Sequence, residues 1–167
     1  MTGVQTCALP ICGEDALAER CSPLLSTLGT VMHVGPIGAG TAAKLVANTT
    51  LVGIIGVLGE ALAIGQALGL PRERTFEVLG VTALADQAER RRAAVESGDY
   101  PPRFALRLAR KDADLILEAA EKHGVDLRVV KGAQEWLADA EAAGLGDADY
   151  SAVLARILES QEASSDK

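Results

Sequence analysis

The chain has 167 residues, 49% hydrophobic and 23% charged, so it can bury a core and does not have the composition of a disordered protein. Aromatic residues make up only 3%, which favours packed helices over sheets, because strands draw on aromatic and β-branched side chains. The formal net charge of −7 excludes nucleic acid as a partner, since lysine and arginine must neutralise its phosphates.

The first twelve residues, MTGVQTCALPIC, show no helical or strand periodicity and differ in composition from the rest. From Met1 to Ile11 they resemble the translation of a standard sequencing-library adapter, with GTG as the start codon. We therefore expect residues 1–12 to be an artefactual leader outside the fold, and the protein itself to begin further upstream. A short natural leader is the alternative. The three cysteines are an odd number without metal-ligand spacing, which predicts a reducing cytoplasm rather than disulfides.

A helix and a strand are predicted next. Apolar side chains recur at helical spacing through residues 13–28, and Gly29 follows as a helix-ending glycine would. The β-prone run of residues 30–34 predicts a single strand, closed by a Gly-Pro pair. One strand needs a sheet, and no further strand is evident, so residues 13–35 are expected to be the end of a domain that began upstream.

The remainder predicts helices. The longest, from about residue 38 to 68, is apolar nearly all round and is expected to be enclosed by other helices. A membrane span is not expected, because its uncharged run between Lys44 and Glu60 is shorter than the about 20 residues that a bilayer requires. Asp149 is the expected N-cap of the last helix. The other predicted helices cover residues 72–79, 83–96, 105–123, 132–143 and 150–160.

These elements predict a mainly α fold, a helical bundle built around one long buried helix. Residues 36–160 form this helical domain, and residues 161–167 are expected to be a disordered tail.

A glycine-rich segment opens the long helix. Gly38-x-Gly40-x-x-Ala43, with Glu60 further on, mimics a dinucleotide-binding fingerprint. That fingerprint needs its acidic residue at the end of a second strand, whereas Glu60 falls within the same predicted helix. We therefore reject it as a dinucleotide site.

Lys44 and Asn48 are four residues apart, which places them one turn apart on one helix face. A lysine there can hold a substrate oxygen and exchange a proton with it, and burial would lower its pKa towards that task. Spacing alone leaves the alternative that Lys44 extends into solvent and Asn48 is a packing group. Lys111 and Asp112 alone could likewise be a charged pair on a solvated face. No spacing of histidines or cysteines predicts a metal site.

Three segments carry a resemblance to a known family. G-x-x-G-x-G-x-x-x-K-x-x-x-N (35–48), F-x-L-x-L-x-x-K-D-x-x-L (104–115) and G-x-G-D-x-D-Y-S-A (144–152) are similar, in order, to motifs of the β-hydroxyacid dehydrogenases. The resemblance covers about residues 13–160. It implies that residues 13–35 end a truncated Rossmann domain and that residues 36–160 form the helical substrate and dimerisation domain.

The resemblance also implies an activity. Lys44 would be the catalytic acid/base, Asn48, Gly38 and Gly40 would contact the substrate, and Lys111 would reach the cofactor, NAD or NADP. The reaction would interconvert a short β-hydroxyacid and its semialdehyde or ketone in a homodimer or tetramer formed through the helical domain. This chain alone is expected to be inactive, because the main cofactor-binding domain would lie upstream. The alternative is a non-catalytic helical dimerisation module.

Overall fold

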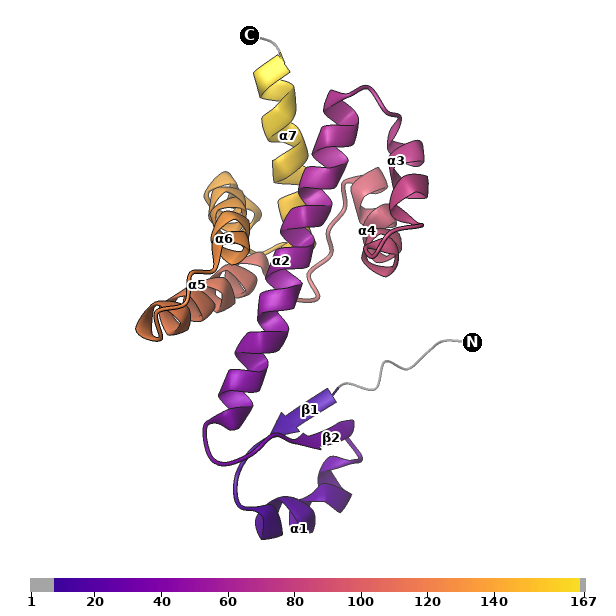
Figure 1. Cartoon of the computed structure of the whole chain (residues 1–167). Coiled ribbons are helices and arrows are strands. Elements are labelled where there is room, and N and C mark those ends of the chain that lie inside the picture. Colours follow the sequence, from indigo (N-terminus) through magenta and orange to yellow (C-terminus); the bar gives the residue numbers. More distant parts are fainter. Residues whose placement is uncertain (1–7, 166–167) are drawn as a thin grey trace. The chain divides into compact units, whose positions relative to one another are not determined.

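The computed structural model describes residues 8–165 and divides into two compact units, residues 1–47 and 48–167, each considered by itself. Residues 1–7 of the predicted leader and the last two residues of the predicted tail lie outside the described range. Figure 1 shows the order of the elements along the chain.

The first unit contains a two-stranded parallel sheet. Strand β1 (Ala8–Ile11) pairs with β2 (Thr30–His33), with Ala8 opposite Thr30 and Ile11 opposite His33, and α1 (Asp15–Leu25) connects the strands. The prediction that residues 1–12 lie outside the fold is therefore wrong for Ala8–Ile11. The strand predicted at residues 30–34 was also expected to have no partner in the chain, whereas β2 pairs with β1. Pairing gives hydrogen-bond partners to backbone N–H and C=O groups of both strands. The periodicity of one segment does not reveal this stabilisation, because it depends on the other strand. The adapter origin of residues 1–12 stays a prediction.

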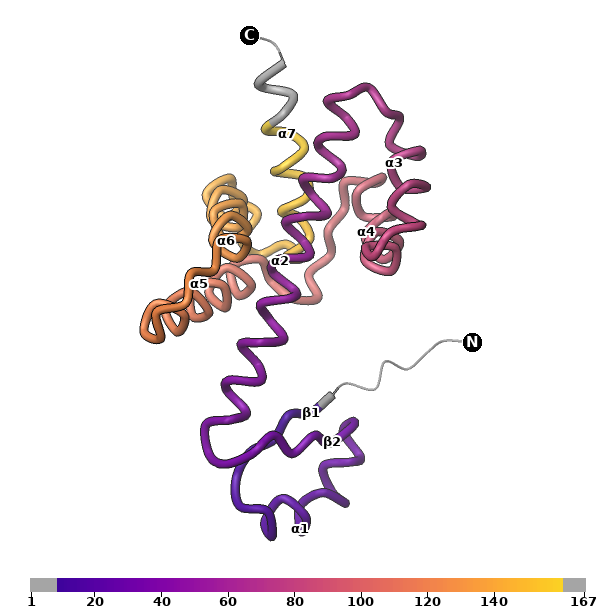
Figure 2. Tube along the Cα trace, viewed as in Figure 1, coloured from indigo at the N-terminus to yellow at the C-terminus, as the bar shows by residue number. Residues whose placement is uncertain are grey.

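The prediction of a mainly α fold is confirmed. Helix α2 (Ala39–Ala67) is followed by α3 (Arg72–Leu79), α4 (Ala85–Ser97), α5 (Leu106–Lys122), α6 (Arg128–Ala140) and α7 (Val153–Ser165). A π-helical turn, η1 (Glu141–Leu145), ends α6, and a short 3-10 helix, η2 (Tyr150–Ala152), precedes α7. Figure 2 follows the chain from α4 through the irregular loop of residues 98–105 into α5.

Helix α2 is buried on one side of its C-terminal half. Val52 and Leu58 are fully buried, whereas Val57 and Ile64 are 45% and 57% exposed. The prediction that other helices enclose the whole of α2 is therefore wrong for its exposed side. By length and composition alone α2 could cross a membrane, but 33% of its most apolar window is already buried within the protein.

Small residues let α2 approach α6 and α7 closely. A Cβ atom at Gly56 would lie 3.0 Å from the Cβ of Ala133 on α6, and one at Gly59 would meet the side chain of Ile157 on α7. Ile157 is fully buried, as are Leu106, Leu137 and Leu154. The core of the second unit thus lies where α2, α5, α6 and α7 meet, and tight packing there defines the helix positions.

Two predicted boundaries differ from the structure. Helix α6 begins at Arg128, four residues before the predicted start at Gly132, because Val130 is buried and extends the apolar face. Helix α7 continues to Ser165, so the prediction of a disordered tail from residue 161 is wrong as far as Ser165. The expected N-cap is confirmed, because the side chain of Asp149 accepts a hydrogen bond from the backbone N–H of Ser151 at the start of η2.

Candidate functional site

The glycine-rich segment forms the turn into α2. Gly38 has φ +99°, a left-handed conformation that favours glycine, and apart from Gly38 and its two chain neighbours no heavy atom of the described residues lies within 4 Å of a Cβ atom built there. A Cβ atom at Gly40 would lie 3.2 Å from Sγ of Cys12. Glu60 lies within α2 and accepts a hydrogen bond from Nε1 of Trp136 at 3.1 Å, so it does not complete a dinucleotide fingerprint.

Lys44 lies on the N-terminal part of α2, within the first unit, and its side chain is exposed. The burial that sequence reasoning considered for it is therefore not observed, because the buried residues of α2 begin only at Val52. Asn48 is the first residue of the second unit and is half-buried.

Asn48 is hydrogen-bonded to a buried carboxylate on another helix. Its Nδ2 donates to Oδ2 of Asp112 on α5 at 2.8 Å, and Oδ1 of Asp112 lies 3.8 Å from Nζ of Lys111. Asp112 is only 8% exposed, whereas the side chain of Lys111 is 59% exposed. The carboxylate thus joins the predicted substrate contact to the predicted cofactor contact, through a charge-assisted hydrogen bond and an ion pair.

Sequence reasoning did not assign Asp112 a place in the site. The signal was present, because Asp112 shares the buried face of α5 with Ala109, Ala113 and Ile116, at helical spacing. A carboxylate on such a face needs a polar partner, since burying an unpaired charge is costly. Asn48 is one such partner.

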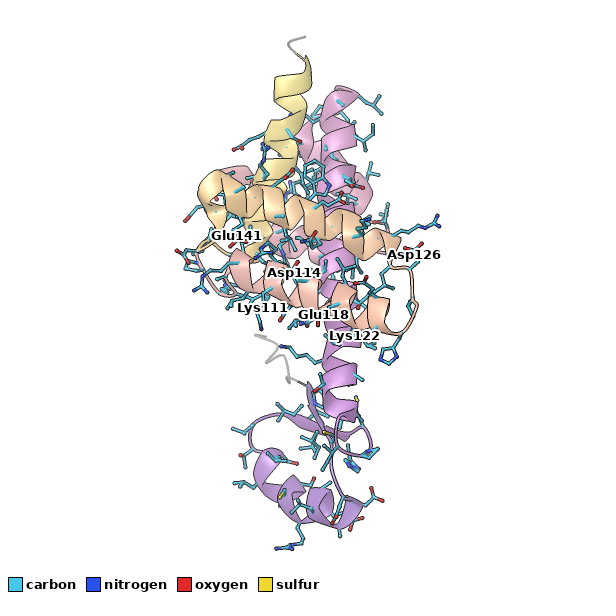
Figure 3. All side chains as sticks on the ribbon, turned by 90° about the vertical axis from the view of Figure 1, so that its left-hand side faces the viewer. Lys111, Asp114, Glu118, Lys122, Asp126 and Glu141 are labelled. Atoms are coloured by element: carbon cyan, nitrogen blue, oxygen red, sulfur yellow. The ribbon has the colours of Figure 1, made fainter. Side chains whose placement is uncertain are left out.

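A second polar network holds α5 against α6. Arg110 Nη1 donates to Oδ2 of Asp114 at 2.7 Å, and Nε2 of Gln134 on α6 donates to the other oxygen of Asp114 at 2.7 Å. Arg110 Nε also donates to Glu141, in η1. Figure 3 shows Asp114 and Lys111 along α5, with Glu141 beyond the end of α6. These bonds support the helix that carries Lys111 and Asp112.

Asp149 ties the loop before α5 to η2. Its carboxylate accepts hydrogen bonds from Ser151 Oγ at 2.6 Å, from the backbone N–H of Ser151 at 3.1 Å, and from those of Phe104 and Arg103 at 3.2 and 3.3 Å. Burial raises the pKa of this carboxyl, but the four hydrogen bonds together outweigh it and hold the pKa below its ordinary value. Asp149 therefore stays ionised at neutral pH.

Metal ligation has no support in the described range. Within residues 8–165, no group of three or more histidine, cysteine, aspartate or glutamate side chains is placed to hold a metal ion. The ammonium of Lys111 is exposed and positively charged, so it fits an anionic group such as a phosphate of a dinucleotide.

Comparison with known proteins gives the class to which this helical chain belongs, a family named for NAD binding in a dehydrogenase. The family described as NAD-binding of NADP-dependent 3-hydroxyisobutyrate dehydrogenase matches residues 38–157, and the chain belongs to this family. The resemblance to β-hydroxyacid dehydrogenases and the prediction of NAD or NADP as cofactor are thereby confirmed.

Individual relatives agree with this assignment. The chain is 34% identical over 152 residues to 2-(hydroxymethyl)glutarate dehydrogenase of Eubacterium barkeri, covering 89% of this chain and 50% of the relative. It is 31% identical over 149 residues to 3-sulfolactaldehyde reductase of Escherichia coli, covering 87% of this chain and 50% of the relative. The crystal structure of 3-hydroxyisobutyrate dehydrogenase from Salmonella typhimurium superposes with a TM-score of 0.75 at 29% identity, covering 85% of this chain and 51% of that one. The chain spans about half the length of these relatives.

Proposed function

We propose that this chain supplies the substrate-binding helical half of an NAD(P)-dependent oxidoreductase that interconverts a short β-hydroxyacid and its semialdehyde or ketone. The observation that carries the proposal is the link from Asn48 through Asp112 to Lys111. It joins the two residues for which the sequence suggested substrate and cofactor contacts, although 64 positions separate Asn48 from Asp112. The names of the relatives, dehydrogenases and reductases of small molecules, support the same class of reaction.

Asn48 is suited to orienting a substrate. Its Nδ2 donates to Asp112, which sets the direction of the amide, and its Oδ1 accepts no hydrogen bond from residues 8–165. The amide can therefore accept a hydrogen bond from a hydroxyl, and the second N–H of Nδ2 can donate to a carboxylate oxygen. A β-hydroxyacid carries both groups.

Lys44 is proposed as the acid/base. It precedes Asn48 by one helical turn on α2, and its ammonium can protonate the carbonyl oxygen during reduction or, as the amine, accept the hydroxyl proton during oxidation. A bound dinucleotide would donate the hydride to the carbonyl carbon during reduction, or accept it from that carbon during oxidation. Protonation of the oxygen and addition of hydride to the carbon together convert a carbonyl to an alcohol, so the atoms and charges balance.

Lys111 and the glycines are proposed for the remaining contacts, each considered within its own unit. The exposed ammonium of Lys111 would hold an anionic part of the dinucleotide, while Asp112 limits where that ammonium can move. The open space at Gly38 supports close approach of a substrate to the backbone. A substrate has less space to approach the backbone at Gly40, because the side chain of Cys12 lies beside it.

The test starts by sequencing the source DNA across the 5′ end with an independent library. If the reading frame continues upstream, the longer protein is expressed and assayed with NAD and NADP against a panel of short β-hydroxyacids and their aldehydes. Lys44→Ala should lower kcat by at least about 100-fold and leave the Kd of the dinucleotide nearly unchanged. Lys131→Ala, at an exposed lysine of α6, is the matched control and should retain full turnover. Turnover of Lys44→Ala within about threefold of wild type would remove Lys44 from the acid/base role.

Self-association is the second candidate function. Val57 and Ile64 on α2 and Leu68 just beyond it are exposed apolar side chains in a helical stripe, which favours packing against a second copy as a homodimer or tetramer. Light scattering should detect an oligomer of the 167-residue chain, and Ile64→Lys should shift it to monomer. An oligomer in a longer protein that shows no turnover would favour the non-catalytic dimerisation module instead.

A further inference from the structure

A pocket outside the proposed active site opens between α4 and the loop of residues 98–105. Its volume is about 440 Å³, and neither Asn48, Lys111 nor Asp112 lines it. The lining includes three arginines, two aspartates and three aromatic residues, which are Arg90, Arg91, Arg103, Asp99, Asp149, Tyr100, Phe104 and Tyr150. Arg90 donates to the carboxylate of Asp86, which leaves Arg91 and Arg103 as the arginines of interest.

The arginines of this pocket have more hydrogen-bond donors than the protein uses. Arg91 lies over the ring of Tyr150, 5.3 Å from its centroid, and its Nη2 donates to the hydroxyl of the same tyrosine. Its Nε is buried and has no acceptor among the described residues. For the guanidinium of Arg103, no acceptor is found within residues 8–165.

The acceptors of the pocket are largely occupied. Asp149 also lines it, but its carboxylate already accepts four hydrogen bonds, two from Ser151 and one each from Phe104 and Arg103. Asp99, exposed at the loop, is the remaining carboxylate of the lining. Guanidinium donors therefore exceed acceptors here, and a guanidinium pairs best with a planar carboxylate or a phosphate.

We propose that this pocket binds an oxyanion group, a carboxylate or a phosphate, between Arg91 and Arg103. Tyr150 holds the Arg91 guanidinium in place, so little side-chain entropy is lost when the anion binds. The loop that forms one wall is fastened to the start of η2, because Asp149 accepts hydrogen bonds from the backbone N–H groups of Arg103 and Phe104. An anion bound there stabilises the second unit by binding the folded state alone.

Titration of the ¹⁵N-labelled 167-residue chain at pH 7 tests this proposal. Sodium phosphate and sodium acetate are added separately, with sodium chloride keeping the ionic strength constant, and amide shifts are followed by NMR. Saturable shifts are expected in residues 90–104, with a Kd of about 1–10 mM for the better of the two anions. Saturation by phosphate alone identifies a phosphate group, whereas saturation by acetate identifies a carboxylate.

Three variants make the test specific. Arg103→Gln, at an exposed side chain, should weaken binding by about tenfold or more, and Asp99→Asn should tighten it because a like charge is removed. Arg74→Gln, at an exposed arginine of α3 outside the pocket, should bind as wild type does. The absence of saturation by either anion, or equal affinity of wild type and Arg103→Gln, would overturn the proposal.

Discussion

Replacing Asn48 and Asp112 with alanine, singly and together, measures the hydrogen bond that joins α2 to α5. The donor and acceptor are 2.8 Å apart, the acceptor is ionised, and Asp112 is 8% exposed. Hydrogen bonds to charged groups contribute about 1.5–3 kcal/mol, and an unsatisfied buried partner adds to the cost of a single replacement. Asn48→Ala should therefore lower the free energy of unfolding by about 1–3 kcal/mol.

Asp112→Ala should cost more than Asn48→Ala, because it also removes the carboxylate that faces Lys111. The double variant isolates the pairwise contribution, since every interaction that Asp112 makes elsewhere cancels in the cycle. We expect a coupling energy of about 1–2 kcal/mol.

Urea unfolding followed by circular dichroism gives the four free energies, with the slope of the transition checked for constancy. The control cycle uses Arg74 and Glu77 on α3, whose side chains pair at 2.6 Å but are 63% and 49% exposed. That pair should couple by no more than about 0.5 kcal/mol. A coupling between Asn48 and Asp112 as small as in the control would refute the link on which the proposed site depends.

Two further predictions concern packing and pH. Gly56→Ala should destabilise the chain by about 1–3 kcal/mol in urea unfolding, because its Cβ would lie 3.0 Å from Ala133 Cβ and 3.5 Å from Ala133 Cα, which cannot move without the helix. Gly53→Ala, where the nearest atom is Val129 Cγ1 at 3.5 Å, should instead be neutral or stabilising by up to about 1 kcal/mol; equal effects of the two variants would contradict the packing of α2 on α6. Asp149→Asn should destabilise the chain by at least about 2 kcal/mol at pH 7, because an amide cannot accept four hydrogen bonds as the carboxylate does. Since the folded pKa of Asp149 lies below its ordinary value of about 3.9, its contribution is present above that pH and is lost as pH falls through the folded pKa. The difference between wild type and Asp149→Asn should thus shrink between pH 5 and the acid limit of folding, and a difference independent of pH would contradict the role of the ionised carboxylate.

Local features of the sequence were sufficient for the fold class. Helical spacing of apolar residues predicted the order of the helices, and Asp149 was identified as an N-cap from its type and position. Boundaries were less accurate where packing extended a helix, as at the start of α6, where buried Val130 adds to the apolar face.

Interactions between distant segments could not be predicted in this way. Ala8–Ile11 has no periodicity of its own and becomes a strand because Thr30–His33 lies beside it. The exposure of one side of α2 likewise depends on which helices cover it, because its sequence is apolar nearly all round.

In the candidate site, too, local features could be predicted from the sequence and contacts between distant segments could not. The sequence by itself determined that Lys44 and Asn48 lie one turn apart, because helix geometry relates residues four apart. It also suggested Lys111, through resemblance to a family. Only the tertiary structure decided that Asp112 joins Asn48 to Lys111, because that link depends on how α5 packs against α2, across 64 positions of sequence. A buried carboxylate requires such a partner, but the packing of the whole core determines which residue supplies it.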